Sequence, residues 1–204
     1  MVLDLEFPVS STSAITVDHG YHLYAGLSRA LTAVHSENGI AVHPIRGTQI
    51  GNRMLQIMPW SRVRIRTPQH KIGELITLTG KRIRIGDHSI SLGVPRVRAL
   101  EPTTTLRSRL VTIKGFEDAD EFGSAVQRQL DSLEISEQVI LTVGKRRTIR
   151  IRDKEVVGFE VVLEGLTAME SVTIQERGVG GRRRMGCGVF VPKGNMSRIS
   201  DAQV

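Results

Sequence analysis

The sequence predicts an α+β fold made of two ferredoxin-like (RRM-like) domains in tandem, each with the element order β-α-β-β-α-β. Segments whose apolar residues alternate with a period of two, as in strands, are separated by segments with helical spacing. This order occurs twice along the 204 residues. A hydrophobic fraction of 40% is sufficient for a packed core, so the chain is not predicted to be disordered.

The first predicted domain spans residues 1–97. It begins with a strand, "VLDLEFPV" (2–9), and changes to helical spacing from Tyr21, with Asp18 as the predicted N-cap and Gly39 as the residue that closes the helix. The later elements are a short strand or loop in "IAVHPIRGTQIG", a hairpin in "MLQIMPWSRVRIRTP" turning near Pro59, a short helix in "QHKIGELITL", and a hairpin in "KRIRIGDHSISLG" turning at Gly86 and Asp87.

The second predicted domain, residues 98–192, repeats this order. Its elements are a strand in "RSRLVTIKGF", a helix in "EDADEFGSAVQRQLDSL", two or three strands in "QVILTVGKRRTIRIRDKEVVGFEVVLEG", a helix in "LTAMESVTIQER" and a final strand in "CGVFVP". The last helix contains three consecutive β-branched residues, which weaken its helical propensity. Residues 93–105, with two prolines, are predicted to form the boundary, and residues 193–204 a tail.

The charge balance indicates a polyanionic partner. There are 28 Lys and Arg residues against 21 Asp and Glu, which gives a formal net charge of +7 and a pI near 10.2. Nucleic acid or an acidic membrane surface would suit this charge, and a basic protein without such a partner is the alternative. No apolar run approaches the roughly 18 residues of a spanning helix, and the N-terminus does not read as a signal peptide. We expect no membrane association and a cytoplasmic location.

Arginines alternate with apolar residues in three predicted strands, within "SRVRIRT" (61–67), "KRIRIG" (81–86) and "TIRIRD" (148–153). A period of two places the arginines on one face of each strand, and the planar guanidinium group suits phosphate. An ordinary solvated sheet face is the alternative. The predicted RNA-binding residues of these strands are Arg62, Arg64, Arg150 and Arg152. Aromatic residues make up only 4% of the chain, which favours recognition of shape and phosphates over base stacking on the sheet.

A glycine-rich loop within "QERGVGGRRRMGCGVFVPKG" leads into the final predicted strand. Its glycines would let backbone N–H groups approach phosphates, and its arginines add positive charge. The predicted RNA-binding residues here are Gly178, Gly180, Gly181, Arg182, Arg183, Arg184, Gly186 and Gly188. The loop fits neither a Walker A motif, which needs Lys where Cys187 stands, nor a dinucleotide motif, which needs Gly where Arg183 stands. A flexible surface turn is the alternative.

The segment "GVGGRRRMGCGVFVP", together with "DHGYHLYAGLSRAL" and "IAVHPIRG" in the first half, resembles the CRISPR-associated repeat endoribonucleases, the sixth family of Cas proteins in the repeat-associated mysterious protein superfamily. The resemblance covers residues 1–192 and is greatest to forms that serve bacterial type I systems. It implies a metal-independent endoribonuclease without a cofactor, which binds the CRISPR repeat hairpin and cleaves precursor CRISPR RNA into guide RNAs. In that family, the 2′-hydroxyl next to the scissile phosphate is the nucleophile.

The same resemblance implies where the catalytic residues lie, because the family carries them on the first helix and just after it. His43, in "HPIRG", is the first candidate, with Arg46 at the following basic position. His35 is its strongest rival, and Tyr24 lies near it on the helical wheel. Arg29 occupies a helix position where some members carry Tyr or His. His19 and His22 are further candidates.

No metal site is predicted. The only acidic cluster, "EDADE" (117–121), is better explained as a cap that complements the dipole of the following helix. The partners implied by the resemblance are the precursor, the mature guide RNA and the other subunits of a type I effector complex. A non-catalytic RNA-binding subunit of such a complex is the second hypothesis. A basic DNA-binding protein ranks last, because no helix-turn-helix or zinc finger is recognisable.

Overall fold

The computed structural model describes residues 1–36 and 39–196. Contacts divide the chain into two compact units. Unit 1 contains residues 1–99, 149–155 and 184–186, and unit 2 contains residues 100–148, 156–183 and 187 onward. Both units are discontinuous in sequence, whereas the predicted domains, 1–97 and 98–192, are continuous. The tip of one hairpin and three residues of the glycine-rich loop group with unit 1.

The main sheet of unit 1 is antiparallel and has the strand order β3-β6-β1-β8-β7, with β9 also pairing with β1. The strands are β1 (Val2–Ser10), β3 (Ala41–Val42), β6 (Arg62–Pro68), β7 (Arg82–Ile85), β8 (His88–Leu92) and β9 (Arg96–Ala99). One face of β1 carries Leu3, Leu5 and Phe7 into the core, because alternate residues point to the same side. The predicted hairpin that turns at Gly86 and Asp87 is confirmed by the pairing of β7 with β8.

Helix α1 (Gly20–Ala30) covers the core face of this sheet through Leu23 and Leu27. It is shorter than predicted: Leu31 is extended, and a separate helix α2 (Ala33–Ser36) follows. The predicted N-cap is also wrong, because His19 occupies that position without a capping side-chain bond. The carboxylate of Asp18 instead accepts a hydrogen bond from the backbone N–H of Arg150 at 2.9 Å. The helix predicted after β6 is confirmed as η1 (Gln69–Lys71) and α3 (Ile72–Ile76).

A second, small sheet of unit 1 has the order β2-β5-β4, with β2 (Ile15–Thr16), β4 (Thr48–Ile50) and β5 (Met54–Gln56). The hairpin predicted to join β5 to β6 is therefore wrong. β5 pairs with β4 and β2, while β6 pairs with β1 and β3. The alternation of β6 identified it as a strand, but alternation alone does not choose between partner strands.

Unit 2 has a four-stranded antiparallel sheet in the order β11-β12-β10-β13. Its elements are β10 (Thr105–Val111), α4 (Ala119–Ser132), β11 (Ile140–Ile151), β12 (Lys154–Glu164), α5 (Ala168–Arg177) and β13 (Val191–Pro192); the tip of the β11–β12 hairpin belongs to unit 1. Counted along the chain, this order is second, third, first, fourth. The strands β3, β6, β1 and β8 of unit 1 have the same order.

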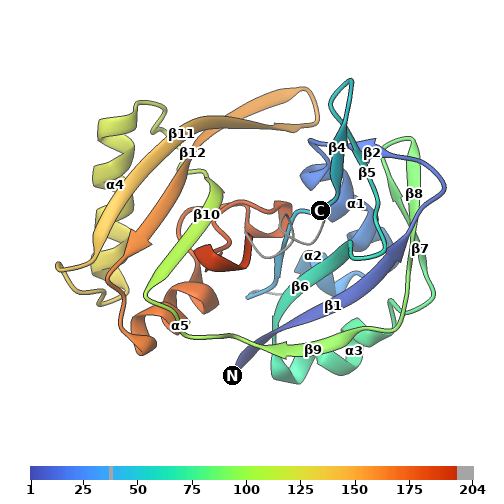
Figure 1. Ribbon diagram of the computed structural model, residues 1–204, viewed down its shortest axis with the longest axis horizontal. Coiled ribbons are helices and arrows are strands. Elements are labelled where there is room, and N and C mark those ends of the chain that lie inside the picture. The colour runs from blue at the N-terminus through green and yellow to red at the C-terminus, as the bar shows by residue number, and fades with distance from the viewer. Residues whose placement is uncertain (37–38, 197–204) are drawn as a thin grey trace, which may run out of the picture. The chain divides into compact units, whose positions relative to one another are not determined.

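Helices α4 and α5 each have a capping residue at the N-terminus and apolar residues on the face that packs against the core. Asp118 caps α4 by accepting hydrogen bonds from the N–H groups of Asp120 and Glu121, which confirms the predicted role of the acidic cluster. Helix α4 lies beside the β11–β12 hairpin in Figure 1, and Phe122 packs on Phe159 with ring centroids 4.8 Å apart. A capping box between Thr167 and Glu170 starts α5, in spite of its β-branched residues.

These two antiparallel sheets, each with helices between its strands, confirm the predicted α+β, tandem ferredoxin-like fold class. The final strand is shorter than predicted, since only Val191 and Pro192 pair with β10. Of the predicted tail, residues 193–196 form a 3-10 turn, and residues 197–204 lie outside the described residues. Within the described part of the chain, no helix is long and apolar enough to span a bilayer.

Candidate active site

A tyrosine and a histidine meet on the surface of unit 1. The hydroxyl of Tyr24, on α1, lies 2.5 Å from Nδ1 of His35, on α2, and their rings stack with centroids 6.1 Å apart. The break after α1 brings these residues together across a separation of eleven positions. His35 is exposed, whereas the body of Tyr24 packs against the core. The core therefore holds the ring of Tyr24 in place, and His35 is open to solvent.

This arrangement suits proton transfer. A tyrosine hydroxyl can donate or accept, and a neutral imidazole has one donor and one acceptor nitrogen. When the hydroxyl donates to Nδ1 of His35, its Nε2 carries the ring proton and can donate it. When Nδ1–H donates to the hydroxyl of Tyr24, Nε2 has a lone pair and can accept a proton. Contact with Tyr24 thus orients the imidazole and leaves Nε2 for a substrate.

An arginine of the glycine-rich loop, Arg184, places a positive charge next to this pair. The guanidinium group of Arg184 donates a hydrogen bond to the carbonyl oxygen of His35. Two glycines allow the loop to approach so closely. A Cβ on Gly20, at the start of α1, would lie 2.4 Å from the carbonyl oxygen of Met185. A Cβ on Gly186, whose φ is +86°, would lie 2.8 Å from Cγ of Pro44.

The tip of the β11–β12 hairpin contributes two more arginines to unit 1. The backbone of Arg150 is tied to Asp18, and Nε of Arg152 donates to the hydroxyl of Tyr21 at 3.2 Å. Both arginine residues are exposed. The sequence predicted these arginines as RNA-binding residues but did not predict Asp18 and Tyr21, which position them at the start of α1. The pairing residues lie 132 and 131 positions away, so no local pattern could reveal them.

His19 has a structural environment. It is 2% exposed, and both ring nitrogens face backbone groups: Nδ1 lies 2.9 Å from the carbonyl oxygen of Thr16, and Nε2 accepts from the N–H of Ile45 at 2.9 Å. Because a carbonyl oxygen can only accept, Nδ1 is the donor and the ring is neutral. His19 therefore ties residue 45 to the start of α1 and has no nitrogen available for a substrate.

His43 lies in the interior of unit 1. It is 8% exposed, and its Nε2 is 3.6 Å from a carboxylate oxygen of Asp4. Burial lowers the pKa of His43 to about 4, helped by the nearby charges of Arg66 and Arg64 and opposed by Asp4. The imidazole is therefore neutral at pH 7 and enclosed. The geometry does not favour the first catalytic candidate of the sequence, and it does favour its rival, His35.

The partner of His43 is itself part of a buried ion pair. Arg66 donates to both carboxylate oxygens of Asp4, from Nε at 2.8 Å and from NH2 at 3.0 Å. Burial acts to raise the pKa of Asp4, but the contact with His43 and the hydrogen bonds and charge of Arg66 hold it well below its usual range. Arg66 is 1% exposed and Asp4 4%. The sequence did not predict this Asp4–His43–Arg66 cluster. In "LDLEF", however, acidic residues alternate with apolar residues in the same way as the arginines of β6 do.

The other arginines of β6 are also matched by protein groups. Arg64 forms an ion pair with Glu6 at 2.5 Å, and the register places Glu6 and Asp4 of β1 directly opposite Arg64 and Arg66. Arg62 donates to the carbonyl oxygens of Pro59 and Ser61. This face therefore carries mixed charge, as the alternative interpretation expected. Arg29, in the last turn of α1, and Arg46, after β3, are both exposed.

In unit 2, the glycine-rich loop is bonded within the protein. The N–H groups of four glycines already have acceptors: Gly178 donates to Ile174, Gly180 to Gln129, Gly181 to Thr112 and Gly188 to Leu110. The geometry therefore does not favour the idea that these N–H groups hold phosphates. Arg182 donates to the hydroxyl of Thr112, and Arg183 donates to the carbonyl oxygen of Glu176. Contact with RNA would fall to the side chains, and it stays a prediction.

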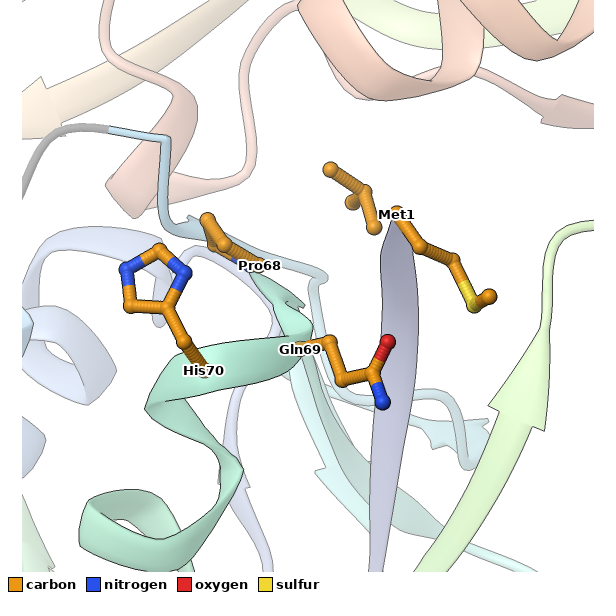
Figure 2. Close-up of a pocket in the computed structure, with 5 residues that line it drawn as sticks. Met1, Pro68, Gln69 and His70 are labelled. Carbon is orange, nitrogen blue, oxygen red and sulfur yellow. The ribbon is translucent and has the colours of Figure 1, made fainter.

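A pocket between the start of β1 and the end of β6 is lined by Met1, Val2, Pro68, Gln69 and His70 (Figure 2). It includes none of the predicted site residues. Among the described residues, no group of three or more His, Cys, Asp or Glu side chains is arranged to hold a metal ion.

Comparison with known proteins gives a consistent set of relatives. The family model described as "Cas6 Crispr" matches residues 3–195. The chain is 40% identical over 197 residues to a CRISPR-associated endonuclease Cas6 from Myxococcus xanthus (strain DK1622), covering 97% of this chain and 84% of the relative.

Solved structures with the same fold are more distant in sequence. A CRISPR-associated protein Cas6 superposes with a TM-score of 0.67 at 12% identity, covering 94% of this chain and 99% of the other. A RAMP protein that binds different RNA substrates superposes with a TM-score of 0.64, and a Cas6-related protein from Pyrococcus furiosus with 0.63, both at 12% identity. They cover 92% and 94% of this chain, respectively, and each is covered over 98% of its own length. At this identity, the likeness concerns the fold.

Proposed function

We propose that this chain, which belongs to the Cas6 family of CRISPR-associated proteins, is an endoribonuclease that cuts precursor CRISPR RNA within its repeats. The Myxococcus xanthus relative is a CRISPR-associated endonuclease, and the RAMP protein with the same fold binds RNA. The net charge of +7 suits a polyanionic substrate. We further propose that the reaction is metal-independent and that the bound element is the repeat hairpin.

The single observation that supports the catalytic proposal best is the exposed Tyr24–His35 pair with Arg184 beside it. Metal-independent cleavage needs a group that accepts the proton of the 2′-hydroxyl, a group that protonates the leaving oxygen, and positive charge near the phosphate. His35 has a nitrogen for the proton transfer, and Tyr24 orients it. The arginine lies close enough to neutralise developing negative charge.

The proposed reaction is an internal transesterification of the RNA. The 2′-oxygen attacks the adjacent phosphorus while its proton leaves, and the bond from phosphorus to the 5′-oxygen breaks. The 5′-oxygen takes up a proton, so the products are a 2′,3′-cyclic phosphate and a 5′-hydroxyl. His35 accepts the first proton through Nε2 when Nδ1–H donates to Tyr24. The imidazolium ion that results then donates the proton on Nε2 to the 5′-oxygen, so His35 returns to its neutral form.

This assignment changes the order of the sequence-based candidates. The sequence ranked His43 before His35, but His43 is enclosed beside Asp4, while His35 is exposed. A proton-transfer residue must come within about 2.6–3.2 Å of a substrate oxygen, which an enclosed imidazole cannot do. We therefore propose His35 and Tyr24 as the catalytic pair and Arg184 as the adjacent cation. Arg29 and Arg46 stay predictions, and so do the partner subunits of an effector complex.

The test is cleavage of the repeat RNA encoded in the host genome, with EDTA in excess. We expect cutting at one position and the two product ends described above. A substrate with a single 2′-deoxy nucleotide just upstream of the cut should bind almost normally and remain intact. Binding without cleavage of the natural repeat would favour the non-catalytic RNA-binding subunit. A strict need for Mg²⁺ or Mn²⁺, or efficient cutting of the 2′-deoxy substrate, would contradict the mechanism.

A further inference from the structure

We infer that Trp60, in the turn between β5 and β6, is a stacking subsite for an unpaired nucleobase of the bound RNA. The inference rests on the proposed function, because it assumes an RNA ligand. Trp60 is the only tryptophan of the chain, and it is 37% exposed. The sequence indicated little base stacking because no strand carries an aromatic platform. Trp60 lies in a turn, where a strand pattern cannot reveal it.

The turn that carries Trp60 is closed by hydrogen bonds. Ser61 is fully buried, and its hydroxyl accepts from the N–H of Met58 at 2.9 Å and donates to the carbonyl oxygen of Arg46 at 2.6 Å. The N–H of Ser61 also donates to the carbonyl oxygen of Met58 at 2.8 Å. These bonds close residues 58–61 into one turn and fasten it to the segment after β3. The backbone of Trp60 is thus fixed before any ligand binds, which lowers the entropic cost of binding.

A cation is held at the turn that carries the indole. One guanidinium nitrogen of Arg62 donates at 2.7 Å to the carbonyl oxygens of both Pro59 and Ser61, which flank Trp60 in the chain. These bonds keep the positive charge at the turn. An exposed indole and a guanidinium group held at the same turn match a nucleotide, which has a flat base and an anionic phosphate. A protein partner would not require that combination.

The ligand class follows from geometry. In a paired stem, both faces of each base are covered by its neighbours, so a side chain can stack only on an unpaired or terminal base. The ligand is therefore a base in a single-stranded flank or loop of the repeat. Such stacking contributes about 1–3 kcal/mol per base, which corresponds to roughly 5- to 150-fold in affinity.

The experiment uses the fact that the intrinsic tryptophan fluorescence comes from one residue. The full protein is titrated with the host repeat RNA, made uncleavable by one 2′-deoxy nucleotide, and with the paired stem alone. Fluorescein on each RNA reports binding independently by anisotropy. We expect the full repeat to quench Trp60 and the stem to bind with little quenching.

Three variants complete the test. Trp60→Ala should weaken binding of the full repeat by about 5- to 150-fold and of the stem by less than about twofold. Trp60→Phe should retain part of the affinity, because a phenyl ring can still stack. Ile76→Ala is the matched control, since Ile76 is an exposed apolar residue of the same unit, 42% exposed, and should change neither affinity. Equal melting temperatures would show that all three are folded.

Each outcome separates the two proposals. If the full repeat binds with unchanged tryptophan fluorescence, and Trp60→Ala binds it as tightly as the wild type, the stacking subsite is refuted while the endoribonuclease proposal stands. If wild-type protein neither binds nor cuts the repeat, the proposed function fails, and this inference fails with it. A fluorescence change caused by a protein partner but not by RNA would assign Trp60 to protein docking and also overturn the inference.

Discussion

The exposed Tyr24–His35 pair and the buried Asp4–His43–Arg66 cluster are two histidine environments within one unit. In the first, the histidine contacts a neutral hydroxyl and is open to solvent. In the second, it lies beside a carboxylate that Arg66 already neutralises, and it is enclosed. Both histidines follow α1 in the sequence, within eight residues of each other, and both have a polar neighbour. A list of residue types and spacings would not distinguish them.

The difference shows that a polar partner does not by itself make a histidine catalytic. Burial keeps His43 neutral, and its enclosure keeps substrate oxygens away, so its contacts serve the fold. His35 is exposed, and a substrate can therefore reach it, which proton transfer requires. We therefore expect changes at the exposed pair to affect the reaction rate and changes in the buried cluster to affect stability.

The largest expected effect comes from His35→Ala. Loss of a proton-transfer group should lower single-turnover cleavage by about 10²–10⁴-fold, with repeat binding changed by only a few fold. His43→Ala is the matched control, and it should retain most of the cleavage rate in molecules that remain folded. Rapid cleavage by His35→Ala, combined with loss of cleavage in a stably folded His43→Ala protein, would reverse the assignment.

The buried cluster is tested by Asp4→Ala. Removing the carboxylate leaves the guanidinium group of Arg66 buried without its counterion, which should cost about 3–5 kcal/mol of unfolding free energy in urea denaturation. The double variant Asp4→Leu with Arg66→Met removes both charges and should recover most of that loss. Unchanged stability in the single variant would show that the pair is more hydrated than its burial indicates.

A pH titration of stability separates the two histidines further. In the folded protein, the pKa of His43 is lowered from 6.5 to about 4, so between these values the unfolded state binds more protons than the folded state. The contribution of neutral His43 to the free energy of unfolding is therefore fully present above pH 6.5. It is lost as the pH falls toward 4, by about 3 kcal/mol in total. Below pH 4, protonation of Asp4 should remove more, since its pKa is also lowered. In His43→Gln, the loss between pH 6.5 and 4 should be smaller by that amount; an identical pH profile would contradict the burial argument.

The smallest expected effect comes from Arg184→Ala. Loss of its hydrogen bond to the carbonyl oxygen of His35 is expected to cost about 1 kcal/mol, or roughly fivefold in cleavage rate at saturating RNA. Arg146→Ala removes an exposed arginine of β11 and serves as a charge-matched control. It should change the salt dependence of binding at most, and not the rate at saturation. Equal rate effects of the two variants would mean that Arg184 acts only through its general charge.

Local patterns in the sequence determined several elements of this protein. The alternation in "VLDLEFPV" predicted β1, the acidic run before Phe122 predicted the cap of α4, and Gly86 with Asp87 predicted the turn between β7 and β8. These features depend on neighbours within a few residues, whose side chains and backbone decide the outcome together. The glycine-rich loop, with two motifs of the first half, indicated the same family as the comparisons.

Only the tertiary structure decided which strand pairs with β6, where α1 ends, and whether His35 or His43 is exposed. A period of two shows that Val63 and Ile65 share a face, but the partner of β6 depends on carboxylates of β1 some sixty residues earlier in the chain. The same holds for the loop glycines, whose N–H groups are used by Thr112, Leu110 and Gln129. The burial of a residue and its hydrogen-bond partners depend on residues distant in the chain, so a local sequence pattern cannot predict them.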